Sequence, residues 1–453
     1  MSTARSDPLD VAYARSQFPS LANGYIFADN AGGSQILQPC IDKLTDYLVN
    51  SNVQLGADYS VSVESTKRVN EGKLAVAKLF GITGSEKDAV ESVVLGSSST
   101  LLVENLARAM EGDIRPGDEF IITGEHEANA GPWKKLAARR GGVVRYWPAS
   151  PISSSPNNPY AVSLKISDLL PLITPNTRLV AFTACSNILG SVIPVKEVVE
   201  KVRERAKELG ARKVEISVDC VAYAPHRRIR VEDWGVDYCF FSLYKTYGPH
   251  ISALYTRPHA LSTSIASLAH HFLPTSSSPI TKLQPGGPGY ELVYATTAVT
   301  PYLLSLSPVS TSSESDRLDQ AFDVIKAHEQ ILVRRLLSWL ESKERWERGV
   351  RVVGESLSDL TSEGEAAVER RVPTISFVIV GERNMGSKDV VKVFDQKGGI
   401  GIRYGHFYAY TLVEELKPKL DIDDAVVRIS LVHYNTVEEV DRIIEILSEV
   451  FAR

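Results

Sequence analysis

The sequence lacks the features that mark several classes of protein. It has four cysteines, none in a C-x-x-C pair, and nine histidines without metal-ligand spacing, so neither a disulfide framework nor a metal site is expected. No apolar run approaches the roughly 20 residues that span a bilayer. A net charge of −5 gives no basic footprint for nucleic acid or an anionic membrane surface. These absences argue against nucleic-acid and membrane partners.

Length and composition are those of an ordinary globular enzyme. Charged residues make up 23% and hydrophobic residues 43% of the chain, which is close to average usage. A chain of 453 residues exceeds the size at which one hydrophobic core keeps growing, so two domains are expected. Residues 1–10 lack the apolar core of a secretory signal, which predicts a cytoplasmic location.

Residues 90–257 alternate between short apolar strands and amphipathic helices. Strands joined by helices of this length need crossover connections, which give a mostly parallel sheet covered on both faces. The chemistry of such a sheet gathers at the carboxyl ends of its strands. Strands are expected at 93–95, 120–123, 143–147, 179–184, 214–218 and 236–241, and helices at 101–110, 133–140, 167–173 and 195–209.

A Ser/Thr/Pro-rich interval at 305–315 precedes a long charged helix from 316 to about 343, which marks the start of a smaller domain. The prediction is therefore an α/β protein with a large, mostly parallel sheet domain and a smaller α+β C-terminal domain. The predicted parts are an N-terminal segment that packs with the small domain (1–24), the large domain (25–300) and the small domain (301–453). Within the last, strands are expected at 374–380 and 426–432, and helices at 388–396 and from 436 to the end.

Lys245 follows the apolar run 236–241 and stands beside the Gly248-Pro249 turn. Burial at a strand end lowers the pKa of a lysine, and a neutral amine can attack a carbonyl to form a Schiff base. A surface lysine in a loop is the alternative. However, Asp219 ends another apolar strand, and a lysine with an acidic partner for a pyridine nitrogen is the pair that a pyridoxal phosphate enzyme needs. The sequence therefore predicts pyridoxal 5'-phosphate bound covalently through Lys245.

Three further motifs follow predicted strands at the same edge of the sheet. Ser97 and Ser98 precede a helix whose dipole and backbone amides favour an anion such as phosphate, with plain helix capping as the alternative. His126 can stack on a pyridine ring, or is a solvent-facing histidine in a loop. Asn187 offers a neutral amide to the phenolic oxygen of the cofactor, or is the centre of a turn.

Arg428 begins an apolar strand near the C-terminus. A guanidinium inside such a strand is costly unless it is paired. Its planar fork matches a carboxylate, so a substrate carboxylate is the natural partner, and an internal salt bridge is the competing account. Arg403, in Gly401-Ile402-Arg403-Tyr404-Gly405, is expected to assist at the same site or to be structural.

The order of these motifs resembles that of class V aminotransferases of the cysteine desulfurase type, over nearly the whole chain. The matching motifs are Asp29-Asn30-Ala31-Gly32, Glu125-His126, Ser186-Asn187-Ile188-Leu189-Gly190, Val218-Asp219, Ser242 with Lys245 and Gly248-Pro249, and Arg428 with Tyr434-Asn435-Thr436. The motifs Gly287-Pro288-Gly289-Tyr290 and Gly405-His406-Phe407-Tyr408 mark the cysteine desulfurase-like branch. The resemblance implies the aspartate aminotransferase fold (fold type I), pyridoxal phosphate as cofactor, and a homodimer with active sites at its interface.

The resemblance also implies a role for each matching residue. As catalytic residues it implies Lys245 bonded to the cofactor, Asp219 under the pyridine nitrogen and His126 stacked on the ring. The other implied cofactor contacts are Ser97, Ser98, Asn187, Ser242 and Gly287. The implied substrate contacts are Asn30, Arg403, Tyr408 and Arg428.

Three positions depart from the desulfurase pattern. Tyr244 stands where a histidine usually precedes the lysine, Ala222 where a glutamine contacts the ring, and Tyr408 where the mobile-loop cysteine takes up sulfur. Persulfide formation needs an exposed thiolate on a flexible loop, and the four cysteines all lie in or beside predicted strands and helices: Cys40, Cys185, Cys220 and Cys239. The sequence therefore predicts an enzyme that does not form a persulfide.

The favoured function is a lyase that acts on a small amino acid. It would catalyse either β-elimination with C–S cleavage or β-decarboxylation with carbon–carbon bond formation. An aminotransferase, a racemase and a persulfide-forming cysteine desulfurase are the enzymatic alternatives, because the sequence does not show which bond at the α-carbon stands perpendicular to the ring. A pyridoxal phosphate-binding scaffold without turnover is the non-enzymatic alternative.

Overall fold

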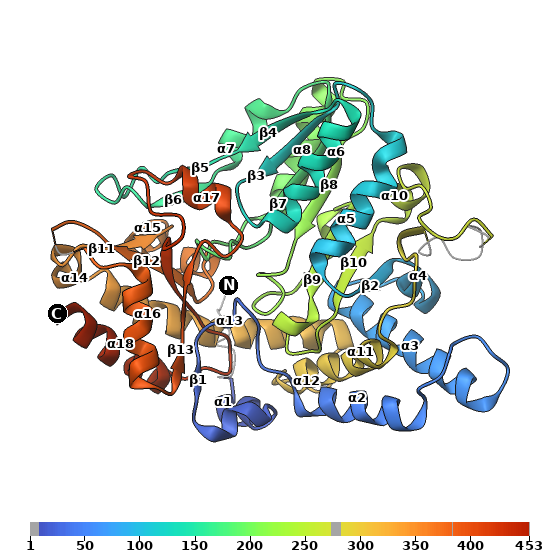
Figure 1. Cartoon of the computed structure of the whole chain (residues 1–453), viewed down its shortest axis with the longest axis horizontal. Helices are drawn as coiled ribbons and strands as arrows, with labels where there is room; N and C mark the ends of the chain where they lie inside the picture. The colour runs from blue at the N-terminus through green and yellow to red at the C-terminus, as the bar shows by residue number, and fades with distance from the viewer. Residues whose placement is uncertain (1–8, 273–281, 383, 453) are drawn as a thin grey trace.

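The computed structural model describes residues 9–272, 282–382 and 384–452. Its centre is a seven-stranded sheet in the order β2-β10-β9-β8-β7-β3-β4 (Figure 1). Only β10 runs antiparallel to its neighbours within this sheet. The strands are β2 (Val93–Gly96), β3 (Glu119–Thr123), β4 (Val143–Trp147), β7 (Thr177–Thr183), β8 (Glu215–Asp219), β9 (Tyr238–Ser242) and β10 (Ser252–Thr256). The predicted α/β class with a mostly parallel sheet is thus confirmed.

Alternation along the strands puts side chains on two faces, and each face has its own helices. Phe120 and Ile122 of β3 pack with α5 (Ser99–Met110) and α6 (Gly131–Arg140). Ile121 packs on the other face, in the core that includes α8 (Val195–Glu208). Burial on both faces explains why the parallel strands read as continuous apolar runs in the sequence.

Between β4 and β7 the chain forms a short hairpin, β5 (Ala149–Pro151) with β6 (Val162–Leu164). One predicted segment there differs from the structure. The helix expected at 167–173 is one turn, α7 (Ile166–Leu169), followed by a 3-10 turn. Pro171 occupies the start of that 3-10 turn, and proline cannot donate the backbone hydrogen bond that a continuing helix needs.

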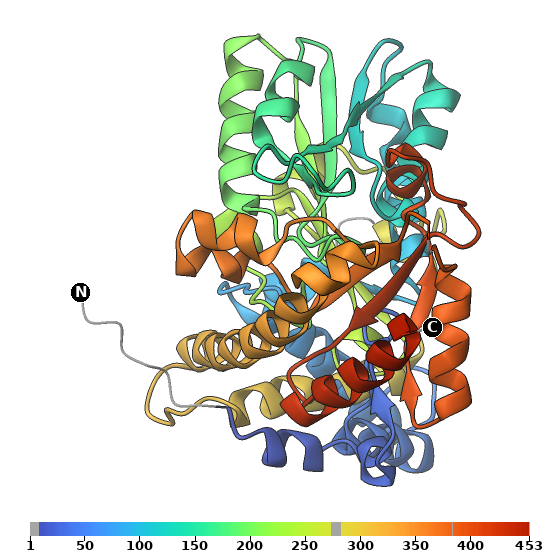
Figure 2. The same ribbon diagram turned by 90° about the vertical axis from the view of Figure 1, so that its left-hand side faces the viewer.

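A second sheet is antiparallel, in the order β11-β12-β15-β14. Its strands are β11 (Val350–Val353), β12 (Thr374–Ile379), β15 (Val426–Ser430) and β14 (Arg403–Gly405). Three helices lie beside this sheet (Figure 2): α13 (Glu314–Leu340), α16 (Ser387–Lys397) and α18 (Val437–Ala452). Their apolar side chains pack in its core. The first half of α13 packs instead in the core of the large sheet, with Leu318 and Ile325, so this helix connects the two cores.

The N-terminal segment contacts both parts of the chain. In α1 (Val11–Ser16), Arg15 forms a 2.8 Å ion pair with Glu439 of the second part. Phe18 packs edge-on against Tyr302 and Tyr434. The short strand β1 (Ile26–Phe27) then pairs with β13 (Ile400–Gly401). The exact domain limits at residues 24 and 300 stay a prediction.

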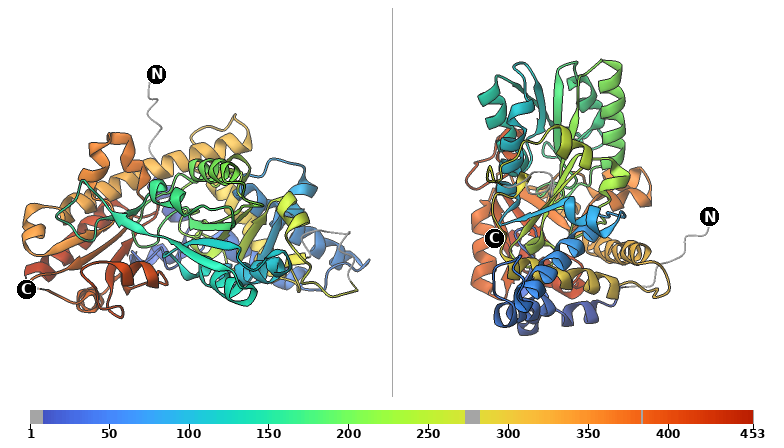
Figure 3. Two further views of the ribbon diagram at one scale, coloured as in Figure 1. Left: turned by 90° about the horizontal axis from the view of Figure 1, so that it is seen from above. Right: turned by 90° about the vertical axis from the view of Figure 1, so that its right-hand side faces the viewer.

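The remaining helices surround these sheets (Figure 3). They are α2 (Gln38–Asn50), α3 (Ser60–Leu79), α4 (Glu86–Glu91), α9 (Val231–Trp234), α10 (Pro258–Thr263), α11 (Tyr290–Ala295), α12 (Val299–Ser305), α14 (Lys343–Glu347), α15 (Leu357–Ser362) and α17 (Tyr410–Glu415). Within the described ranges, none of the helices is long and apolar enough to cross a membrane.

Candidate active site

The carboxyl ends of the parallel strands meet around one cavity, as the parallel arrangement predicts. Strand β8 ends at Asp219, and β9 ends at Ser242, three residues before Lys245. Strands β3 and β7 end shortly before His126 and Asn187. Six predicted site residues line the cavity: Ser98, His126, Asn187, Asp219, Ser242 and Lys245.

Lys245 is 7% exposed and has no hydrogen bond or ion pair with any residue that the structure describes. Burial, and secondarily the positive charge of Arg428, lower its pKa from 10.5 to about 8. Asp219 acts in the opposite direction and favours the charged form. The amine is therefore uncharged in an appreciable fraction of molecules near neutral pH, as a nucleophile requires.

Asp219 is also buried, at 3% exposure. Burial raises the pKa of its carboxyl to about 6, against the effect of the Val221 amide, which donates a 2.8 Å hydrogen bond to Oδ1. The group is mostly ionised at pH 7 and has one oxygen left for a second donor. This arrangement suits a partner that presents a protonated ring nitrogen.

The small residues before α5 form a cluster of hydroxyl groups. Ser99 Oγ lies 2.8 Å from Ser242 Oγ, and Ser98 caps the helix by accepting a hydrogen bond from the Leu101 amide. Ser99 and Thr100 line the cavity together with Ser98. Ser97 is exposed and is not among the lining residues, so its contact with the phosphate stays a prediction.

Gly287 is exposed and lies beside Tyr290, and it is not among the residues of this chain that line the cavity. Its contact with the cofactor stays a prediction. The segment belongs to the loop before α11, whose position the local sequence does not specify.

His126 stands beside the cavity with its Nδ1 accepting a 3.2 Å hydrogen bond from the Ala128 amide. Burial, then the nearby charges of Lys245 and Arg428, lower the pKa of His126 to about 3. Its imidazole is therefore neutral at physiological pH. An uncharged imidazole can stack on a flat aromatic ring. The Tyr408 ring lies 5.5 Å away, centroid to centroid.

Asn187 donates through Nδ2 to the Phe407 carbonyl at 3.0 Å. Its Oδ1 is buried and has no hydrogen-bond partner among the described residues. Buried polar atoms without partners are rare and call for an explanation. The cavity thus presents three polar groups: the amide of Asn187, whose oxygen has no partner, the amine of Lys245 and the carboxyl of Asp219. These groups fit the polar groups of pyridoxal phosphate.

The guanidinium of Arg428 is partly engaged within the chain, and its contact with a substrate carboxylate stays a prediction. Arg428 is 1% exposed, and its Nη2 lies 2.8 Å from Asp29 Oδ1. Nη1 donates to the Asn187 carbonyl at 3.2 Å, while Nε is buried without a partner in the described part of the chain. The internal salt bridge, the competing account, is therefore present. Arg403 is half exposed and lies 3.5 Å from the other oxygen of Asp29.

Asn30 is not among the residues that line the cavity, so its contact with a substrate stays a prediction. Its Nδ2 donates to the carbonyls of Phe27 and Ser430, and its Oδ1 accepts from the Tyr434 hydroxyl. The amide thus ties the N-terminal segment to β15. Its neighbour Asp29, which the sequence did not single out, holds the two arginines instead.

The loop that carries Tyr408 lies over this group. Phe407 and Tyr408 have backbone φ angles of +49° and +61°, which residues other than glycine rarely adopt. Two contacts hold the strained backbone: Asn187 on the Phe407 carbonyl and the Glu127 amide on the Tyr408 carbonyl, at 2.9 Å. Tyr408 itself is 67% exposed. It occupies the position at which the desulfurase pattern has the loop cysteine.

All four cysteines are buried. Cys185 lines the cavity, but burial raises its thiol pKa far above the ordinary range. Burial also raises the pKa of Cys40 to about 12. Neither thiol is a ready nucleophile, and neither lies in the exposed loop.

Glu125 is a buried acid for which the sequence analysis assigned no role. Its Oε2 accepts from Ser186 Oγ at 2.8 Å, and its Oε1 is buried without a partner among the described residues. Burial raises the pKa of Glu125 to about 7. The only sequence signal was its place directly before His126.

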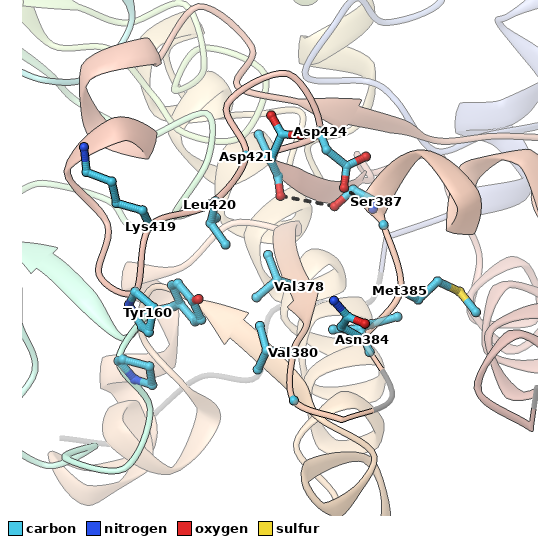
Figure 4. Close-up of a pocket in the computed structure, with 16 residues that line it drawn as sticks. Tyr160, Val378, Val380, Asn384, Met385, Ser387, Lys419, Leu420, Asp421 and Asp424 are labelled. Carbon is cyan, nitrogen blue, oxygen red and sulfur yellow. Dashed lines mark hydrogen bonds between the residues drawn. The ribbon is translucent and has the colours of Figure 1, made fainter.

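A separate cavity of about 540 Å³ lies beside the end of β12 (Figure 4). Val378, Val380 and Leu420 line it, and the carboxylate of Asp424 at its edge accepts hydrogen bonds from the amides of Ser387 and Lys388. Asp424 therefore caps α16. None of the predicted site residues lines this cavity.

Comparison with known proteins agrees with this geometry. The family model described as "Aminotransferase class-V" matches residues 26–277 and 323–443. The aminotransferase-like protein FGM3 of Gibberella zeae is 39% identical over 450 residues, covering 98% of this chain and 99% of that protein. The cysteine desulfurase-like protein ustD of Aspergillus flavus is 30% identical, covering 100% of this chain and 93% of its own.

Solved structures show the same fold. A cysteine desulfurase from Thermococcus onnurineus NA1 superimposes with a TM-score of 0.77 at 22% identity, over 100% of both chains. A mutant of C-DES, which has glycine covalently linked to its pyridoxal phosphate, gives a TM-score of 0.70 at 16% identity, over 96% of this chain and 99% of that one. The chain therefore belongs to the class-V aminotransferase family, which confirms the predicted fold type and the prediction of a pyridoxal phosphate-dependent enzyme.

Proposed function

We propose that this protein is a pyridoxal phosphate-dependent lyase that acts on a small amino acid. Its reaction would be β-elimination with C–S cleavage or β-decarboxylation with carbon–carbon bond formation. The observation that carries the proposal is the combination of a buried, partnerless Lys245 opposite Asp219 with Tyr408, instead of a cysteine, on the loop above them.

When bound, pyridoxal phosphate supplies an electron sink for the bonds at the α-carbon of an amino acid. Lys245 would hold the cofactor covalently, and its amine would move a proton at the α-carbon. Asp219, mostly ionised at pH 7, would keep a proton on the pyridine nitrogen. Neutral His126 would cover one face of the ring, and Asn187 would meet the phenolic oxygen.

The remaining contacts concern the two anionic groups. The hydroxyls of Ser98, Ser99 and Ser242, with the N-terminus of α5, form the phosphate site. Arg428 and Arg403 carry two positive charges against the single negative charge of Asp29. The excess of one positive charge favours one substrate carboxylate at this place.

Persulfide chemistry is disfavoured because no described cysteine is exposed. The phenol of Tyr408 is a poor sulfur acceptor, but it can donate a proton or contact substrate. Turnover of L-cysteine by the wild type and by a variant with all four cysteines replaced by serine or alanine tests this point. Desulfuration to alanine that disappears in the folded, cofactor-loaded variant would reveal an overlooked nucleophile.

Two measurements test the proposal as a whole. Covalent cofactor should give an absorption band near the visible edge of the ultraviolet that Lys245→Ala abolishes, and an unchanged spectrum would refute the assignment. A screen of amino acids with detection of pyruvate, alanine, sulfide and carbon dioxide then identifies the reaction. Accumulation of only a keto acid with aminated cofactor would establish an aminotransferase, and a band without turnover would establish a scaffold.

We also propose that the protein is a cytoplasmic homodimer. Large apolar side chains are exposed along α2 and the start of α3, among them Val49 at 74% and Val63 at 56%. A second copy would remove this surface from water. The molar mass from light scattering would distinguish a dimer from the 49.7 kDa monomer.

A further inference from the structure

The guanidinium of Arg428 is held on three sides. Asp29 accepts its Nη2 at 2.8 Å, and the Asn187 carbonyl accepts its Nη1 at 3.2 Å. The third contact is the Phe407 ring, whose centroid lies 3.7 Å from the Arg428 Cζ. A cation at this distance above an aromatic face is attracted by the ring quadrupole, most strongly where water is excluded. Phe407 is 8% exposed and Arg428 1%, so this contact is desolvated.

Phe407 is itself fixed in place by the cofactor side of the site. Its carbonyl accepts a 3.0 Å hydrogen bond from Asn187 Nδ2, and its φ of +49° is a strained value that persists only where neighbouring contacts impose it. The same ring lies 5.4 Å from the guanidinium carbon of Arg403. Phe407 thus contacts both Arg428, the proposed substrate arginine, and Asn187, which lines the cavity.

We propose that Phe407 is a positioning residue that orients the guanidinium plane of Arg428 toward the α-carboxylate of the substrate. The inference rests on the proposed function, because it assumes that an amino acid binds at this site. Stacking restricts rotation of the guanidinium, which Asp29 contacts at only one nitrogen. Stacking also orients the guanidinium before the substrate arrives, so binding costs less conformational entropy.

The test compares two probes on the cofactor-loaded protein: L-alanine, which has a carboxylate, and ethylamine, which lacks one. Each is titrated while the cofactor absorption reports binding. Phe407→Leu keeps an apolar side chain and the same backbone demand but removes the ring. It should weaken L-alanine about tenfold, or about 1.4 kcal/mol, and leave ethylamine unchanged within about twofold. Phe407→Tyr, which keeps the ring, should restore the affinity for L-alanine.

Other outcomes overturn the proposal. An equal loss for both probes in Phe407→Leu would show a general packing role, and no loss for either would show that the ring does not orient Arg428. A wild type that binds both probes with equal affinity would show that Arg428 does not bind the carboxylate. Absence of the cofactor band from the wild type is a different result, since it would refute the proposed function itself before any probe is added.

Discussion

Replacement of Lys245 by methionine should make the cofactor-free protein more stable at neutral pH. Burial lowers the pKa of Lys245 from 10.5 to about 8. At about 1.36 kcal/mol for each pKa unit, this lowering of about 2.5 corresponds to about 3.4 kcal/mol of unfolding free energy that the buried charge costs below pH 8. Methionine has a similar length, is apolar and carries no charge. The substitution should therefore recover up to about 3 kcal/mol at pH 7.

The pH dependence gives the sign of the effect. Between pH 8 and 10.5 the unfolded chain binds a proton at Lys245 that the folded protein has lost, so wild-type stability should rise with pH in this window. The gain from Lys245→Met should shrink correspondingly and vanish above pH 10.5. Denaturant unfolding of both cofactor-free proteins at several pH values measures it, and groups that do not interact with Lys245 cancel in the difference. A gain that stays constant from pH 7 to 11 would refute the reasoning.

Three further outcomes are expected. Asp219→Asn preserves shape but removes the charge that keeps the pyridine nitrogen protonated, so turnover should fall by about 100-fold or more, at the scale of acid–base contributions, while bound cofactor measured by absorption is retained. His126, whose pKa burial lowers to about 3, should give no imidazole titration between pH 5 and 8 in NMR spectra of the cofactor-free protein; a midpoint near 6.5 would contradict its buried placement. Ser99→Ala should weaken the cofactor in equilibrium dialysis by several-fold, as loss of about 1 kcal/mol predicts, whereas Ser97→Ala should not; the reverse order would restore the assignment made from the sequence.

The local sequence determined the elements and the edge on which the chemistry lies. Continuous apolar runs such as Tyr238–Ser242 indicated strands buried on both faces, and the helices between them imposed parallel order. The carboxyl ends of parallel strands lie at one edge of the sheet. The sequence alone therefore predicted that four residues lie close together there: Lys245, Asp219, His126 and Asn187. Their residue types alone then indicated a pyridoxal phosphate site.

Only the tertiary structure decided how the polar groups are paired. Asp29 and Arg428 are 399 residues apart, and no periodicity links them, because the pairing arises where β1 and β15 pack together. The side chain of Asn30 likewise bonds to a distant residue, donating to the Ser430 carbonyl. Which serine is placed to contact the phosphate, Ser97 or Ser99, depends on the backbone conformation of the turn before α5. Local patterns determine which residues are buried. The partner of each buried polar group depends instead on how distant segments pack, which no single stretch of the sequence specifies.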